Sequence, residues 1–110
     1  MTDRRGQVAV IFASQRNGRD PAGYDAASVA MDALAAAQPG YRGVEAARGP
    51  DGFGITVSYW SDDGSAQAWR DHPDHVATRE AGRTRWYDRY TVTVAQVERG
   101  YDWRAQGAQA

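Results

Sequence analysis

Apolar and polar positions follow two different periods along this chain, which indicates a mixture of strands and helices. The run Gln7–Ser14 (QVAVIFAS) is apolar, rich in β-branched residues and too short for a helix, so it predicts a buried strand. Asp20-Pro21 has the chemistry of a helix start, a capping side chain followed by proline at the first helical position. The helix is predicted to run to Gln38-Pro39-Gly40, with one face formed by Tyr24, Ala27, Met31 and Leu34.

Two further strands are predicted in the middle of the chain. Tyr41–Arg48 and Phe53–Trp60 flank Gly49-Pro50-Asp51-Gly52, which has the composition of a hairpin turn. Side chains alternate along the second of these strands. One side carries Ile55, Val57 and Tyr59, and the other carries Thr56, Ser58 and Trp60.

A helical region in two pieces and a last strand complete the pattern. Ser61 is predicted to cap the first piece, which carries Ala66 and Trp69, and Pro73 begins the second. The second piece runs to about Tyr87, and Gly82 inside it marks a weak spot or a point of close approach. Arg89–Arg99 is predicted as the fourth strand. A single domain over residues 1–103 and a flexible tail over 104–110 follow.

The order of elements predicts the fold. Strand, helix, strand, strand, helix, strand, with right-handed crossovers, gives an α+β, ferredoxin-like βαββαβ arrangement. The helices of such a fold cover one sheet face. The last strand nevertheless has apolar residues on both sides, Val92 and Val94 on one and Ala95 and Val97 on the other. We therefore expect a homodimer in which the two sheets face one another.

Composition narrows the class of protein. The 110 residues suit one domain, and the net charge of −1 argues against a nucleic-acid partner. All 13 cationic residues are arginine, and the absence of cysteine excludes disulfides, thiolate metal sites and a cysteine nucleophile. The N-terminal MTDRRGQ lacks an apolar signal region, and no stretch approaches membrane-spanning length. A cytoplasmic protein without a membrane partner is expected.

The stretch Tyr59–Tyr90 concentrates the candidate chemistry, with three of the four tryptophans, both histidines and five arginines. His75, Arg79 and Trp86 follow helical spacing along one face. If that face points to the sheet, His75 is a candidate general base, because imidazole titrates near neutral pH. Arg79 and Arg83 are candidates for stabilising a developing oxyanion. For Arg83 the alternative is an exposed ion pair with Glu80. For His75 the alternative is a rotated helix, in which Val76 and Tyr87 face the sheet and His75 faces water.

Aromatic side chains offer surfaces for a flat substrate. Tyr59, Trp69 and Tyr90 are candidates for stacking on it, with core packing as the alternative, and for Trp60 core packing is preferred. Trp86, on the same helical face as His75, is a further candidate for binding the substrate. His72 precedes a helix-starting proline, so a structural role is favoured over a substrate contact. The His-x-x-His spacing lacks a third ligand, so no metal site is predicted.

The chain resembles the antibiotic biosynthesis monooxygenase (ABM) superfamily, in its small branch of haem-degrading-monooxygenase-like proteins. The resemblance lies in QPGYRGVEAARGPDGFGITVSYW and in AWRDHPDH followed by GRTRWYDRY. It implies a dimeric α/β barrel. Some members oxidise anthrone-type polyphenols to quinones without a cofactor, others bind haem and open its ring, and many have no assigned activity.

The haem-degrading pattern is met only in part. That pattern has an asparagine in the first strand, a tryptophan on the second helix and a histidine ligand further along. Trp69 fits the tryptophan, VAVIFAS contains no asparagine, Asn17 lies beyond it, and the ligand position falls near Arg79. The prediction is a cofactor-independent monooxygenase that uses molecular oxygen on a small aromatic or polyphenolic compound. Two alternatives stay open: a haem-binding or haem-degrading enzyme, and a non-catalytic small-molecule-binding dimer.

Overall fold

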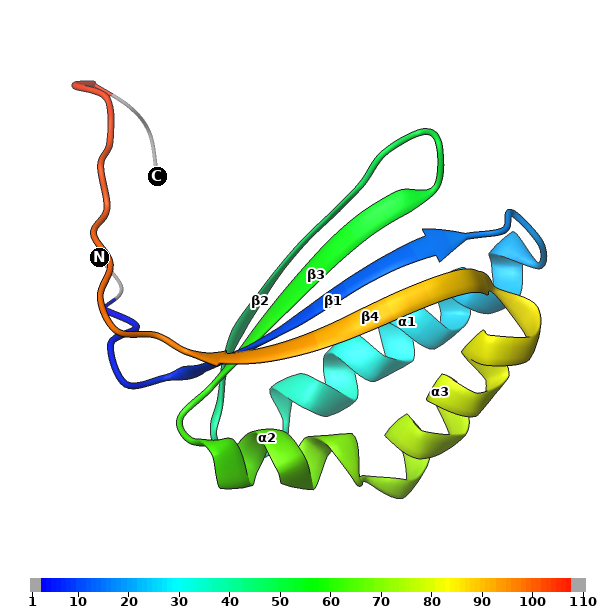
Figure 1. Ribbon diagram of the computed structural model, residues 1–110, viewed down its shortest axis with the longest axis horizontal. Helices are drawn as coiled ribbons and strands as arrows, with labels where there is room; N and C mark the ends of the chain where they lie inside the picture. Colours follow the sequence, from blue (N-terminus) through cyan, green and yellow to red (C-terminus); the bar gives the residue numbers. More distant parts are fainter. Residues whose placement is uncertain (1–2, 108–110) are drawn as a thin grey trace.

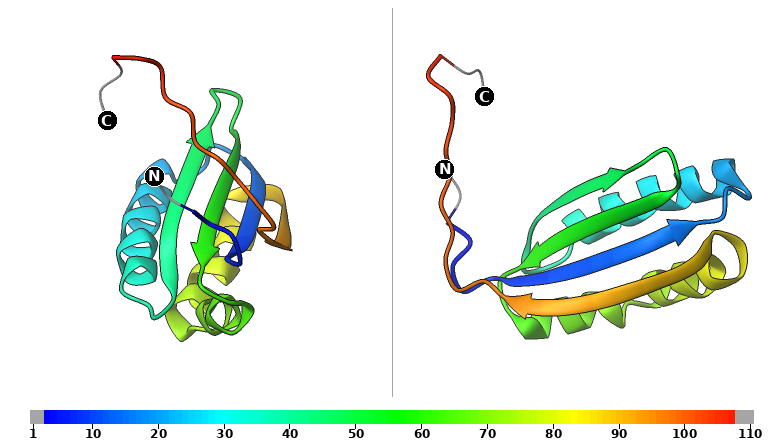
Figure 2. Two further views of the ribbon diagram at one scale, coloured as in Figure 1. Left: turned by 90° about the vertical axis from the view of Figure 1, so that its left-hand side faces the viewer. Right: turned by 45° about the horizontal axis from the view of Figure 1, so that its top comes forward.

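The computed structural model describes residues 3–107 and contains a four-stranded antiparallel sheet with three helices on one face (Figures 1 and 2). The elements are β1 (Val8–Arg16), α1 (Pro21–Ala36), β2 (Tyr41–Arg48), β3 (Phe53–Trp60), α2 (Asp63–Arg70), α3 (Pro73–Arg85) and β4 (Tyr87–Gln96). The strand order is β2-β3-β1-β4, so each helical crossover skips over a neighbouring strand. The predicted ferredoxin-like α+β fold is confirmed.

Several element ends differ from the predicted ones, and hydrogen bonds explain the differences. β1 continues to Arg16, whose backbone N–H donates to the Gly52 carbonyl at 2.9 Å. α3 ends at Arg85, so β4 begins at Tyr87 and not at Arg89, pairing with Arg16 across an irregularity in register. β4 ends at Gln96 and not at Arg99, although Val97 still exchanges backbone hydrogen bonds with Gly6 and Gln7, at 2.9 and 2.8 Å.

The predicted cap of the first helical piece was wrong by one residue. Asp62, and not Ser61, caps α2, because its extended backbone lets the carboxylate accept the Ser65 N–H at 2.7 Å. Ser61 instead donates its own hydroxyl to Asp62 at 3.0 Å. Asp62 is thereby held in the capping position.

The packed core is small and lies at one end of the molecule. Val8, Trp60 and Ala66 form it, and Trp60 is 0% exposed, so the prediction that it is a core residue is confirmed. Across Pro21–Ala36, by contrast, no residue of α1 is fully buried. Over most of its length α1 therefore borders open space and does not pack tightly on the sheet.

The second sheet face carries no helix, as predicted (Figure 1). Strand register places Ile11, Ile55 and Val57 on this uncovered face, and Ile55 is 44% exposed. Beyond β4 the chain runs away from the helix layer in both views, and Tyr101 and Trp103 on it are 91% and 81% exposed (Figures 1 and 2). Apolar surface is thus available on the side opposite the helices.

Two further predictions concern the C-terminal tail and membrane-spanning helices. Residues 104–107 are exposed, while 108–110 lie outside the described residues, so a flexible tail remains a prediction. Within residues 3–107, the structure has no helix that is long and apolar enough to cross a membrane.

Candidate active site

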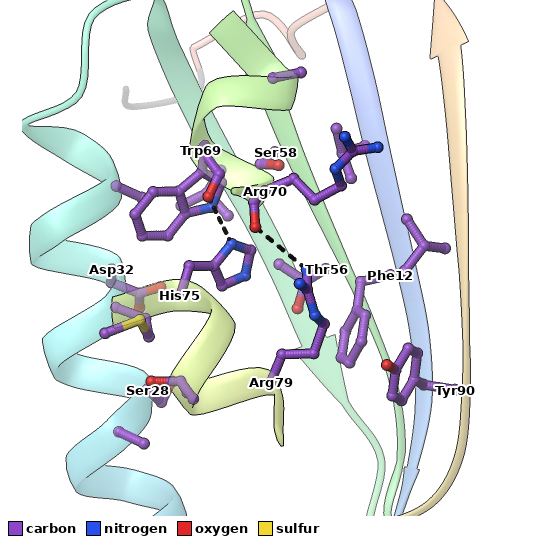
Figure 3. Close-up of a pocket in the computed structure, with 18 of the residues that line it drawn as sticks. Phe12, Ser28, Asp32, Thr56, Ser58, Trp69, Arg70, His75, Arg79 and Tyr90 are labelled. Atoms are coloured by element: carbon purple, nitrogen blue, oxygen red, sulfur yellow. Dashed lines mark hydrogen bonds between the residues drawn. The ribbon is translucent and has the colours of Figure 1, made fainter. Parts of the chain in front are cut away.

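A cavity of about 760 Å³ lies between the helices and the sheet (Figure 3). The sheet face that the helices cover forms one side of the cavity, and residues of α1, α2 and α3 form the other. Its apolar part is lined by Val10, Phe12, Ala27, Met31, Val92 and Val94. A cavity of this size, mostly apolar with a few polar groups, is typical of a small-molecule site.

His75 lies in this cavity at the start of α3, where Pro73 fixes the first helical turn. Its ring stacks on Trp69, with centroids 4.4 Å apart and planes 12° from parallel. Its Nδ1 lies 3.0 Å from the Trp69 carbonyl oxygen (Figure 3). A carbonyl oxygen only accepts hydrogen bonds, so the neutral ring carries its proton on Nδ1. Nε2 therefore keeps its lone pair and is the basic atom.

Burial sets the charge state of His75. Desolvation lowers its pKa below the usual 6.5, the hydrogen bond to the Trp69 carbonyl opposes this, and the positive charge of Arg79 lowers the pKa further. The imidazole is therefore neutral at pH 7. A neutral imidazole with a free Nε2 can accept a proton from a bound ligand.

Arg79 follows His75 by one helical turn and faces the same cavity. Its Nη1 donates to the Arg70 carbonyl at 3.3 Å (Figure 3). The carbonyls of Trp69 and Arg70, at the negative end of α2, thus hold the side chains of His75 and Arg79. The corner between α2 and α3 thus holds the imidazole of His75 and the guanidinium of Arg79 on the same side of the helix, as their spacing predicted.

Arg83 and Tyr90 join α3 to β4 at the open side of the cavity. Arg83 Nε donates to the Tyr90 hydroxyl at 2.8 Å, and Val92 and Val94 beside it are 54% and 55% exposed. Arg83 also pairs with Glu80 at 3.4 Å, and both side chains are largely exposed, so the exposed ion pair was correctly anticipated. Arg83 lines the cavity as well, at its rim.

The two predicted cavity tryptophans are both present, in supporting positions. Trp86 is 5% exposed, and its Nε1 donates to Asp20 at 3.1 Å, which ties the end of α3 to the start of α1. One face of the Trp69 ring is covered by His75. Trp69 therefore supports the base more directly than it could stack on a substrate.

Two predicted substrate-binding residues lie outside the cavity. Tyr59 points to the uncovered face of the sheet, where its hydroxyl donates to Glu45 at 3.1 Å and the Arg4 guanidinium lies 3.7 Å from its ring centroid. The prediction for Tyr59 was wrong, because strand alternation separates two faces without saying which one the helices cover. His72 caps α3 by accepting the Asp74 N–H at 3.1 Å, which agrees with the structural role favoured for it.

Some residues of the cavity carried no signal that singled them out. Thr56 and Ser58 line it from β3, and Phe12 does so from β1. Gly82 is a point of close approach, as one alternative held, because a β-carbon there would lie 2.9 Å from the Tyr87 ring. Within residues 3–107, no group of three histidine, cysteine, aspartate or glutamate side chains is placed to hold a metal ion.

The sequence of this chain matches a known protein family and a relative from another organism. The family model for antibiotic biosynthesis monooxygenase matches residues 8–81. The uncharacterized protein YqjZ of Bacillus subtilis (strain 168) is 48% identical over 91 residues, which cover 83% of this chain and 79% of YqjZ.

Solved structures with the same fold have much lower sequence identity. SnoaB, a cofactor-independent oxygenase from Streptomyces nogalater, superposes with a TM-score of 0.73 at 16% identity, over 86% of this chain and 96% of SnoaB. Rv0793 from Mycobacterium tuberculosis gives a TM-score of 0.72 at 18% identity, over 90% and 99% of the two chains. At these identities the likeness concerns the fold alone.

Proposed function

Because this chain belongs to the antibiotic biosynthesis monooxygenase family, we propose that it is a cofactor-independent monooxygenase that oxidises a small aromatic or polyphenolic compound with molecular oxygen. The main support is a neutral His75 whose Nε2 is left basic inside a largely apolar cavity. SnoaB has the same fold and is a cofactor-independent oxygenase, which supports a reaction without a cofactor in this protein too.

The chemistry assigns one task to each side chain. His75 Nε2 takes a proton from the bound compound, which leaves an electron-rich anion. The guanidinium of Arg79 stabilises the oxygen on which that negative charge develops. The anion reacts with molecular oxygen at a ring methylene carbon, and a carbon–oxygen bond forms. The O–O bond then breaks, one oxygen stays as the carbonyl, and the other leaves as water with the proton held by His75 and the second methylene hydrogen.

Oxygen uptake tests this function. Purified protein with a chelator is mixed with an anthrone, whose ring methylene is the group to be oxidised, and oxygen consumption and quinone formation are followed together. We expect uptake above the uncatalysed rate, with one quinone formed per oxygen consumed. Binding of the anthrone without any uptake would contradict the oxygenase and favour the non-catalytic binding dimer.

Haem is the cofactor that the resemblance to haem-degrading members implies, and the residues here do not match its ligand set. Arg79 occupies the position near which the iron ligand is expected, and β1 carries no asparagine. His75 lies one turn earlier, with its ring flat against Trp69. We therefore predict weak haem binding without ring opening, measured by titrating haemin and following its absorption. Release of iron with a bilin-like product in the presence of a reductant would contradict this.

A further inference from the structure

In the middle of β3, the residues that face the cavity are polar and the residues that face the uncovered side of the sheet are apolar. Thr56 and Ser58 pair with Phe12 and Val10 of β1 and line the cavity, while Ile55 and Val57 face away from the helices. A sheet face covered by helices ordinarily carries the apolar residues. This reversed alternation places two hydroxyls where plain packing would favour valine or isoleucine.

The hydrogen-bonding state of the two hydroxyls leaves both protons available. Ser58 Oγ accepts from Trp60 Nε1 at 3.0 Å, so the hydroxyl is oriented as an acceptor and its own proton remains free. Thr56 has no side-chain hydrogen bond to any other residue in the described range 3–107. Thr56 is only partly buried, so solvent can reach its hydroxyl, and a ligand that displaces this water must supply an acceptor in its place.

The hydroxyls lie on the sheet side of the cavity, and His75 and Arg79 lie on the helix side (Figure 3). A flat ligand between them meets two proton donors on one side and a proton acceptor with a cation on the other. Val10 and Phe12, which pair with Ser58 and Thr56 in the sheet, place apolar surface beside the two hydroxyls. The arrangement suits a ring system with an acidic hydroxyl at one position and a carbonyl oxygen at another.

We propose that Thr56 and Ser58 are specificity-determining residues, which donate hydrogen bonds to a carbonyl oxygen of a flat aromatic substrate. This inference rests on the proposed function for the presence of an aromatic ligand. Sites built to hydrogen-bond a ligand discriminate strongly against analogues that lack the bonding group.

The test compares two probes of nearly equal shape, 1,4-naphthoquinone and naphthalene, by equilibrium dialysis. The chain contains neither cysteine nor lysine, so covalent addition of the quinone to side-chain thiols and amines does not interfere. The readout is the ratio of the two dissociation constants within each variant, so a general loss of stability cancels. Thr56→Val should lower the preference for the quinone about threefold, and Thr56→Val with Ser58→Ala about tenfold or more.

Thr93→Val is the matched control, because Thr93 pairs with Ile11 on the uncovered face and should leave the ratio unchanged. An unchanged ratio in the double variant would overturn the assignment of Thr56 and Ser58 while leaving the proposed oxygenase intact. Failure of the wild type to bind either probe would overturn the aromatic ligand and this assignment together. A lowered ratio in a protein that consumes no oxygen would support the hydroxyl pair and contradict the oxygenase.

Discussion

At the scale of single residues, His75 combines a stacked ring, a fixed proton and a free Nε2 in one position. We predict that His75→Ala lowers turnover by about a hundredfold or more, the usual scale for loss of a general base. The melting temperature should fall only modestly, since a half-buried imidazole contributes little packing. Val76→Ala, one position along α3, serves as the control and should keep its turnover. A His75→Ala protein with full turnover would remove the base from the mechanism.

The lowered pKa of His75 also predicts a pH dependence. The base must be neutral, so kcat/KM should be flat near pH 7 and fall only below 6.5, through the depressed pKa. In the unfolded chain His75 takes up its proton near pH 6.5, before the folded protein does. Its contribution to stability is therefore present above pH 6.5 and is lost as the pH falls through the folded pKa. Titration of the His75 ring followed by NMR checks the direction, and a midpoint above 6.5 would contradict it.

His72 offers a contrast to its neighbour. It caps α3 and does not line the cavity, so His72→Ala should lower the free energy of unfolding by about 1 kcal/mol and leave turnover near that of the wild type. His72→Asn should recover most of that stability, because asparagine is a good cap. Denaturant unfolding of both variants measures this. An equal loss in both variants would show that the cap is not the cause.

The sequence predicted correctly which residues share a helix face, because helical spacing determines this. It did not predict which face of the sheet the helices cover. The spacing of His75 and Arg79 is enough to put them on one helix face, and Pro73 fixes where that helix begins. Strand alternation likewise separates Tyr59 from Thr56 and Ser58. The covered side is decided by how α2 and α3 pack, which involves residues distant in sequence. The sequence pattern therefore predicts Tyr59 as a site residue and does not single out the hydroxyls of Thr56 and Ser58.

At the scale of elements, Asp20 joins two helices through both carboxylate oxygens. One oxygen accepts the Gly23 N–H at 3.2 Å as the cap of α1, and the other accepts Trp86 Nε1 at 3.1 Å. Asp20→Ala should lower the free energy of unfolding by about 2 kcal/mol, because it removes a cap and leaves a buried indole donor unpaired. Denaturant unfolding checks the value.

Asp20→Asn is the informative companion variant. Asparagine tolerates the left-handed backbone found at this position, with φ of 48°, and keeps one acceptor oxygen for two donors. We expect it to lose about half as much stability as the alanine variant. A loss as large as that of alanine would mean that negative charge, and not hydrogen bonding, matters here.

The order of the elements was predictable from sequence because turns and helix starts contain characteristic residues, as at Asp20-Pro21 and Gly49–Gly52. The residues at which elements begin and end were harder to predict. Whether Asp62 or Ser61 caps α2 depends on backbone angles that both residue types allow. Where β4 begins depends on Arg16, which lies 71 positions before Tyr87 and pairs with it.

At the scale of the whole molecule, the uncovered sheet face predicts a homodimer, with an interface large and hydrophobic enough to resemble a divided core. Val57 lies on this face, so Val57→Arg should shift the protein toward monomer, because a charge would be buried there. Light scattering at micromolar concentration measures the mass.

Val29→Arg provides the matched control for the dimer, since Val29 is 71% exposed on α1, in the helix layer. The same change in charge and size there should leave the mass of a dimer intact. A monomer mass for the wild-type protein would contradict the dimer, and with it the barrel formed by two sheets.

The loose contact of α1 with the sheet has a consequence for how such proteins diversify. Cohesion comes from the packed end around Trp60 and from the strand ladders, so Ala27 and Met31 on the cavity wall carry little of it. Substitutions at these two positions should reshape the space offered to a ligand while the scaffold stays folded. Mutations at such positions can accumulate and change the shape of the cavity without unfolding the protein. This is one physical reason why a single fold comes to host unrelated chemistries.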